Sequence, residues 1–120
     1  MELNVKIADR IVLINLLEQY GKKGTSLSEL NQIYKMFDKL EFKDEERKAI
    51  NFRIENGAYM WENKDKDGND LDTDKKVELP DKQVEILNSV LKDKDTKKEF
   101  DIQIFKSIER IAGQIGYVIE

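Results

Sequence analysis

Residues 50–61 read Ile-Asn-Phe-Arg-Ile-Glu-Asn-Gly-Ala-Tyr-Met-Trp and contain the clearest structural signal in the chain. Ahead of Asn56 and Gly57, large apolar residues alternate with polar ones, which is typical of a strand. Asn-Gly is the preferred pair for a two-residue type I′ turn, because both central residues need positive φ. This turn sets the register, so Ile54 is expected to face Tyr59. The stretch therefore predicts a β-hairpin with nearly all its large side chains on one face.

A third strand is expected shortly after the hairpin. Val77 and Leu79 alternate with charged residues in the segment 76–79, which is long enough for a short strand. Paired with the hairpin, this strand would complete a three-stranded antiparallel meander. The intervening residues 63–75 are polar and acidic and are expected to form a flexible loop, because such residues suit solvent-exposed turns.

Helices are predicted on the amino-terminal side of the hairpin. Residues 5–20 have apolar side chains at helical spacing, spread widely enough to favour contacts on more than one side of the helix. A second helix is expected to begin at Ser26, which forms a capping box with Glu29. The acidic run 44–46 favours the first turn of a short third helix, where negative charge suits the helix dipole. The second helix has an apolar seam, expected to face the core, that comprises Leu27, Leu30, Ile33, Phe37 and Leu40, with Tyr34 beside it.

Two further helices are predicted after the meander. Pro80 suits the first turn of a helix over residues 81–91, and the charged segment 92–95 is expected to be a connector. A second capping box, Thr96 with Glu99, is expected to open the last helix. The buried stripe of that helix would comprise Phe100, Ile104, Ile108, Ile111 and Ile115, with Phe105 alongside. Residues 116–120 would form a loose tail.

The sequence thus predicts a single α+β domain over residues 1–120. The elements follow the order α-α-(α)-β-β-β-α-α, with helices flanking the small meander. A chain of 120 residues fits one domain and cannot form two independent cores. Hydrophobic residues make up 39% of the chain and recur periodically, which disfavours disorder outside the acidic loop.

The residue types that are missing say most about function. The chain has no cysteine, which excludes disulfides, thiolate zinc sites and cysteine nucleophiles. It also has no histidine, the usual general base near neutral pH and the commonest transition-metal ligand. Most carboxylates lie in runs with lysines that are typical of solvated faces, and the sequence marks out no catalytic pair of acids. We therefore expect a protein that is not an enzyme and that needs no cofactor.

The charge pattern also limits the partners. The net charge is −4, and 21 basic residues are scattered among 25 acidic ones. Direct binding to DNA or RNA is disfavoured, because the sequence has no basic stripe. The first eleven residues include four charged side chains, so they predict neither a signal peptide nor a membrane span, and the expected compartment is the cytosol. Homo-oligomer formation is left open.

One part of the acidic loop has a weak similarity to a calcium-binding loop. Asn63, Asp65 and Asp67 match the first three ligand positions of an EF-hand, and Gly68 matches its turn. Asp74 falls where a bidentate glutamate belongs. The match is poor, because the first position is an amide, the closing acid is short and a strand precedes the loop. A solvated turn is the preferred interpretation, and calcium is the alternative.

The hairpin and the acidic loop supply the candidate partner-binding residues. The aromatic face of the hairpin is expected to pack under the helices, and partial exposure of it would mark an interface, because Trp and Tyr are enriched at binding hot spots. The candidates on the hairpin are Arg53, Tyr59 and Trp61. The acidic loop would complement a basic groove on a partner, and its candidates are Asp65, Asp67, Asp70 and Asp72.

The chain as a whole resembles a family of small uncharacterised proteins encoded by phages and prophages of Gram-positive bacteria. The resemblance covers about residues 10–111 and departs at residues 65–74, where this loop is longer and more acidic. It implies a phage or mobile-element setting and supplies no catalytic residues. The segments that carry it are Arg10–Leu17, Leu40–Lys48, Ile50–Ile54, Gly57 with Trp61, and Lys75–Leu79.

Three functional hypotheses follow. The leading one is a phage or mobile-element accessory protein that binds and modulates a host protein, with an anti-CRISPR-like inhibitor of antiviral defence as one form of it. The first alternative is a protein that binds or sequesters a small ligand such as a nucleotide, through Arg53, Tyr59 and Trp61. The second alternative is a structural or assembly factor of the phage particle.

Overall fold

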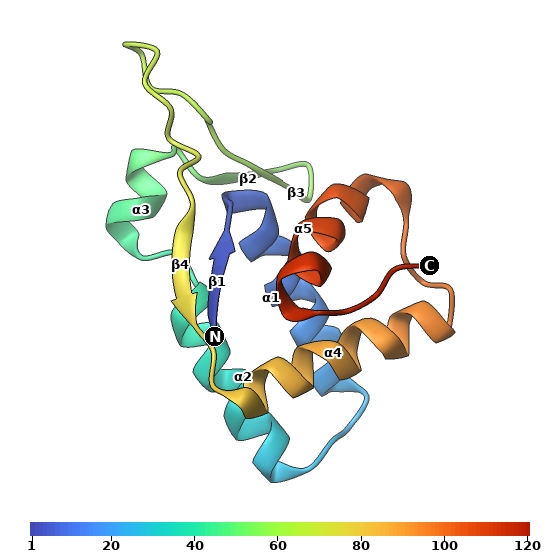
Figure 1. Ribbon diagram of the computed structural model, residues 1–120. Helices are drawn as coiled ribbons and strands as arrows, with labels where there is room; N and C mark the ends of the chain where they lie inside the picture. Colours follow the sequence, from blue (N-terminus) through green and yellow to red (C-terminus); the bar gives the residue numbers. More distant parts are fainter.

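The computed structural model describes residues 1–120, which form an α+β fold of five α-helices, one 3-10 helix and four short strands (Figure 1). The predicted α+β class is therefore confirmed. In chain order the elements are β1 (Glu2–Val5), α1 (Ile7–Lys22), α2 (Leu27–Leu40), α3 (Asp44–Ala49), β2 (Arg53–Glu55), β3 (Ala58–Met60), β4 (Lys75–Glu78), α4 (Asp81–Thr96), η1 (Ile102–Ile104) and α5 (Phe105–Ile115).

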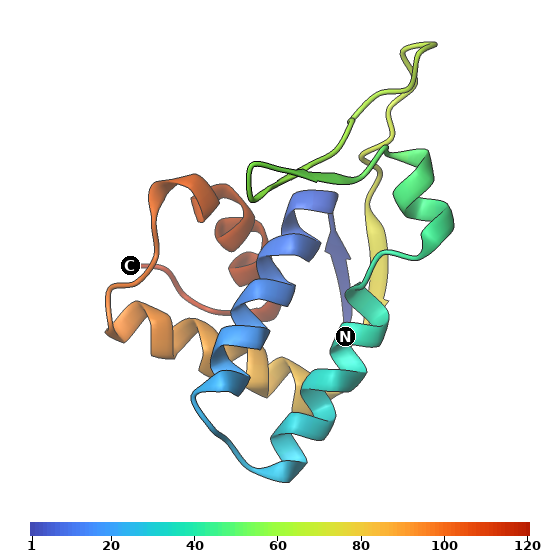
Figure 2. The same cartoon turned by 180° about the vertical axis from the view of Figure 1, so that it is seen from behind.

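Helix α1 lies at the centre of the molecule, with α2, α4 and α5 packed around it (Figures 1 and 2). Its residues Leu13, Leu16 and Leu17 are buried in the main core, which draws side chains from all four of these helices and from β1 and β4. Apolar residues spaced three and four apart on one helix supply such a surface. The prediction of a first helix contacted on more than one side is confirmed.

The predicted three-stranded meander is wrong. Strand β4 pairs with β1, an amino-terminal strand that the sequence reasoning missed, and β2 and β3 form a separate two-stranded sheet. The antiparallel β1–β4 register places Leu3 opposite Val77, and both side chains are buried. Residues 2–5 are hard to recognise as a strand, because a run of four with two apolar side chains fits the approach to a helix equally well.

The hairpin prediction is confirmed. Ile54 pairs with Tyr59, and the turn residues Asn56 and Gly57 have φ values of 52° and 78°, as a type I′ turn requires. The expected packing of the hairpin under the helices is only partly right. Phe52 and the start of the hairpin pack on a small second core, whereas the residues near the turn stay exposed.

Helix α2 begins as predicted, because the Ser26 side chain accepts a hydrogen bond from the Glu29 amide at 3.1 Å. The predicted seam needs correction at two positions. Leu27 and Tyr34 are 85% and 66% exposed, while Met36, which was not predicted, is fully buried. The buried side of α2 is therefore rotated toward Met36 and away from Tyr34. The spacing of apolar residues within single turns of the helix does not reveal this rotation.

The boundaries of the last two helices differ from the prediction. Residues 92–95 continue α4 as a charged, partly exposed turn, and Thr96 ends that helix instead of capping the next. The chain then turns at Lys98, which has a φ of 56°. Asp101 caps η1 by accepting the Gln103 amide at 2.9 Å, and α5 follows. A capping-box pattern is a local signal. It does not show whether its first residue, here Thr96, already belongs to the preceding helix.

Two buried charges at the start of α1 join this helix to its neighbours. The guanidinium of Arg10 is 3% exposed and donates to the carbonyls of Leu40 and Glu41 and to the Glu46 carboxylate. It thereby links α1 to the end of α2 and to α3. Its neighbour Asp9 is also buried and pairs with Arg110 of α5 at 2.7 Å. Buried charges are rarely tolerated without such partners.

Candidate interaction surface

The exposed end of the hairpin carries three large apolar side chains. Ile54, Tyr59 and Met60 are 64%, 44% and 39% exposed. Phe52 joins the hairpin to the body, because its ring stacks on Phe42 with centroids 5.3 Å apart and lies 5.7 Å from the ring of Tyr59. Ile54 and Tyr59 are paired across the hairpin and lie on the same side of it, whereas Met60 follows Tyr59 in β3 and points to the other side. Exposed apolar side chains are typical of protein-binding surfaces, and we call Ile54 and Tyr59 the hairpin face.

The other two predicted hairpin residues, Trp61 and Arg53, make contacts within the hairpin region. Trp61 is half-buried against the second core, and its Nε1 donates to the Asn63 side chain at 2.9 Å. Arg53 donates to the Glu55 carboxylate at 3.0 Å and to the Asn51 carbonyl at 2.9 Å. Of the three aromatic and basic candidates, Tyr59 is the most exposed, at 44%.

Residues 62–74, here called the acidic arm, project from the body of the molecule (Figures 1 and 2). The arm has hydrogen bonds of its own. Its two sides are joined by the bond from the Leu71 amide to the Asn63 carbonyl at 2.7 Å and by a bridge between Lys64 and Asp70. Its tip turns at Gly68, whose φ of 83° suits glycine. The arm therefore folds back on itself as a narrow hairpin-like loop.

The carboxylates of the arm tip serve the local turn. Asp65 Oδ1 accepts the amides of Asp67 and Asn69, each at 2.9 Å. These hydrogen bonds, the Asn69 amide first, lower the pKa of Asp65. Asp67 lies at the tip, exposed and without an ion pair.

The proposed calcium ligands are not gathered into a site. No group of three or more carboxylates in the structure is placed to hold a metal ion. Asp74 lies at the base of the arm and pairs with Lys6 at 3.5 Å, while Asp65 bonds the tip. Asn63 accepts from Trp61. The arrangement is therefore that of a turn stabilised by side-chain hydrogen bonds, as expected for Asp-rich and Asn-rich loops.

Two further candidates anchor the arm to the body. Asp72 Oδ1 accepts the Ile7 amide at 2.9 Å, so a carboxylate of the arm caps the first turn of α1. Asp70 Oδ1 in turn accepts the Asp72 amide at 2.9 Å. The structure thus divides the acidic candidates between the solvent-facing tip and the base, a division that sequence spacing alone does not reveal.

The acidic arm accounts for the whole net charge of the chain. It has six carboxylates and two lysines, a net charge of −4, so the remaining residues contain 19 acidic and 19 basic side chains and are balanced. Charge concentrated on one projecting segment produces a local field that steers oppositely charged partners toward it. The hairpin face and the acidic arm are consecutive in the chain and form the candidate interaction surface.

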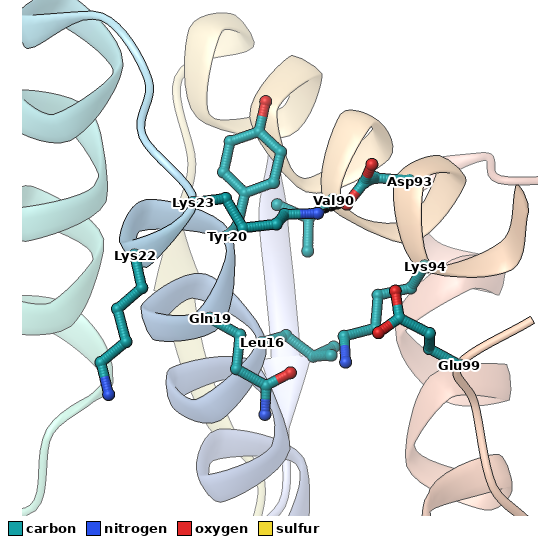
Figure 3. A pocket seen from close by; sticks show the side chains of 9 residues that line it. All are labelled: Leu16, Gln19, Tyr20, Lys22, Lys23, Val90, Asp93, Lys94 and Glu99. Atoms are coloured by element: carbon teal, nitrogen blue, oxygen red, sulfur yellow. Dashed lines mark hydrogen bonds and ion pairs between the residues drawn. The ribbon is translucent and has the colours of Figure 1, made fainter. Parts of the chain in front are cut away.

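A cleft of about 280 Å³ lies elsewhere, between the carboxy-terminal ends of α1 and α4 (Figure 3). Leu16 and Val90 form part of its wall, and most of its rim is charged. Lys23 and Lys97 both pair with Asp93. Lysines in the last turns of helices are common, because they interact favourably with the negative end of the helix dipole and can donate to the unpaired carbonyls there. We interpret this cleft as a structural junction.

A second exposed apolar patch was not predicted as such. Around the start of α5 and the carboxy-terminal tail, Ile102, Phe105, Val118 and Ile119 are exposed. Phe105 was expected alongside the buried stripe of the last helix, but that helix begins only at this residue. Tyr117 ties the tail down by donating to Asp95 at 2.7 Å.

Comparison of the chain with protein-family models, curated proteins and solved structures found no match in any of the three. None of the helices combines the length and the apolar character needed to cross a bilayer.

Proposed function

We propose that this chain acts by binding another protein, with the hairpin face as the apolar contact and the acidic arm as the electrostatic one. The observation that carries the proposal is that the hairpin with the exposed apolar side chains Ile54 and Tyr59 leads directly into a projecting segment that holds the net charge of the molecule. Interfaces combine a buried apolar centre with a polar rim in this way.

The partner fitting this surface is a protein with a basic groove. The four excess negative charges of the acidic arm lie on a narrow projection (Figure 1), a shape and charge that would complement a basic groove. Electrostatic complementarity of this kind raises the association rate and selects against acidic partners. A nucleic-acid-binding protein is therefore the class of partner that we propose.

The biological setting rests on the sequence resemblance. We propose a phage or mobile-element accessory protein that modulates a host protein by occupying its nucleic-acid groove, which includes inhibition of an antiviral defence nuclease. Such a protein works by occlusion and needs no catalytic group. Cytosolic placement follows from this role as part of the same proposal.

Affinity purification from a host lysate tests the proposal. The wild-type chain should recover a nucleic-acid-binding protein, and added duplex DNA should release it. Tyr59→Ser should lose that partner, because it removes the aromatic contact from the hairpin face. Leu27→Ser is the matched control, since Leu27 is exposed on α2, outside the surface. Repeated recovery of nothing, or full retention by Tyr59→Ser, would contradict the proposal.

The nucleotide alternative is separated by a thermal-shift measurement on the purified chain. A bound nucleotide raises the unfolding midpoint by mass action, whereas a protein-binding surface gives no such shift. Arg53 is engaged by Glu55 and by the Asn51 carbonyl, so this alternative has no free cation on the hairpin to receive a phosphate.

A further inference from the structure

A cleft of about 360 Å³ lies where the base of the acidic arm passes α3. Half of its lining is apolar, and the apolar side chains include Phe42, Ile50 and Leu71. Leu71 comes from the arm, while Phe42 and Ile50 belong to the second core. Sites for small molecules have volumes of roughly 300–1,000 Å³ and apolar walls with a few convergent polar groups, and this cleft meets that description.

One polar wall of the cleft is already neutralised. The Arg10 guanidinium lies 3.9 Å from the Phe42 ring centroid and donates to Glu46 at 2.7 Å. The first cause of the lowered pKa of Glu46 is this hydrogen bond from Arg10. Across the cleft, Asp74 is paired with Lys6. Both carboxylates of the lining therefore have cationic partners.

The opposite rim has two hydrogen-bond donors, the side chains of Lys75 and Thr73, that lack close acceptors within the chain. The Lys75 ammonium has Glu46 at 4.0 Å as its nearest carboxylate, and Arg10 holds that carboxylate much more closely. The side-chain hydroxyl of Thr73, also in the lining, makes no hydrogen bond within the chain. Both residues belong to the lining and are two positions apart in the chain, and an ammonium and a hydroxyl are donors that suit a carboxylate.

We propose that this cleft binds a small organic carboxylate with an apolar body. The carboxylate accepts hydrogen bonds from the Lys75 ammonium and the Thr73 hydroxyl, and the body packs on Phe42, Ile50 and Leu71. The site goes beyond the proposed protein-binding function and does not depend on it. Because residues 71–75 form one wall, an occupied site also braces the base of the acidic arm.

Titration of the purified chain with phenylacetate, followed by amide chemical shifts in NMR spectra, tests the site. We expect saturable shifts confined to residues 42–50, residues 71–75 and the start of α1, with a dissociation constant no weaker than about 10 mM. Two probes of similar shape but different charge test whether binding requires the negative charge of phenylacetate. The neutral 2-phenylethanol should bind several-fold more weakly, and the cationic 2-phenylethylamine should bind weakest, because Glu46 and Asp74 are already paired.

Variants make the result specific to the cleft. Lys75→Gln should weaken phenylacetate binding about tenfold, because a charge-assisted hydrogen bond is lost. Lys76→Gln is the matched control, since Lys76 is the next residue of β4 and lies outside the cleft. Ala49→Phe should abolish binding by filling the space, and exposed Ala49 allows this change without disturbing the core.

Three results would overturn the site. These are unsaturated or absent shifts with phenylacetate, tighter binding of the amine than of the acid, and unchanged affinity in Lys75→Gln. Equal thermal midpoints of the wild-type chain and the variants show that each is folded. The titration uses the chain alone, so its failure leaves the protein-binding proposal untouched, and a failed affinity purification leaves this site untouched.

Discussion

Arg10 is the residue on which the junction between the helices and the hairpin region depends most. Its side chain is buried, and its donors go to two carbonyls and one carboxylate on α2 and α3. No repeat or motif in the sequence marks it, because its importance arises from segments 30 to 36 positions away. Only tertiary structure identifies such a residue.

Replacing Arg10 by Met should lower the free energy of unfolding by at least about 2 kcal/mol, because the buried acceptors lose their donors. Urea denaturation followed by circular dichroism measures the change. Arg47→Met is the control, since Arg47 is exposed and lies 5.9 Å from the Phe52 ring. Its effect should stay within about 0.5 kcal/mol. Equal losses in the two variants would contradict the assigned role.

The same contact predicts a pH dependence at Glu46. Arg10 lowers the pKa of Glu46 in the folded chain below its ordinary value. The resulting stabilisation is therefore complete above the ordinary glutamate pKa of about 4.3 and is lost as the pH falls through the lower folded value. Urea midpoints measured from about pH 6 down to about pH 3 should fall less steeply in Glu46→Gln than in the wild-type chain.

Glu45→Gln is the control for that measurement, because Glu45 is exposed and its neighbour in α3. It should follow the wild-type slope. A Glu46→Gln variant that loses stability as steeply as the wild-type chain would show that the Arg10 contact has no influence on the acid transition.

At the scale of secondary-structure elements, the sequence predicts local features well and long-range pairing poorly. The β2–β3 hairpin follows from turn chemistry within a few residues, and so does the cap of α2 at Ser26. The β1–β4 pairing joins residues 70 to 76 positions apart, and each strand alone is too short to signal its partner. The division of the acidic arm into tip and base is invisible for the same reason.

The contact between the acidic arm and α1 is an element-scale interaction that can be measured. Asp72→Ala should destabilise the chain by about 1 kcal/mol, the usual effect of losing a side-chain cap at a helix start. Asp67→Ala, at the tip of the arm, removes the same charge and should change stability by less than about 0.5 kcal/mol. Urea denaturation of both variants makes the comparison. Identical values would argue against the capping role of Asp72.

For the whole molecule, the charge on the arm should govern how fast the proposed partner binds. Replacing Asp65 and Asp67 by Asn keeps the oxygen acceptors of the turn and removes two charges. The association rate should fall several-fold at low salt and lose part of its salt dependence, because exposed charges are screened beyond a Debye length. Surface plasmon resonance at two ionic strengths measures both effects.

Asp38→Asn with Glu85→Gln is the control pair for this experiment. Both residues are exposed on the helical body, and the pair changes the net charge by the same amount. A rate that falls equally in the control pair would mean that total charge, and not its position on the arm, determines the association.

The balance of 19 acidic and 19 basic side chains outside the arm has a consequence for colloidal behaviour. Near neutral pH the helical body is close to its own isoelectric point, where molecules no longer repel one another and tend to precipitate. The arm supplies the mutual repulsion that keeps copies apart. When a cationic groove on a partner neutralises the charge of the arm, the complex should self-associate and precipitate more readily than either component alone.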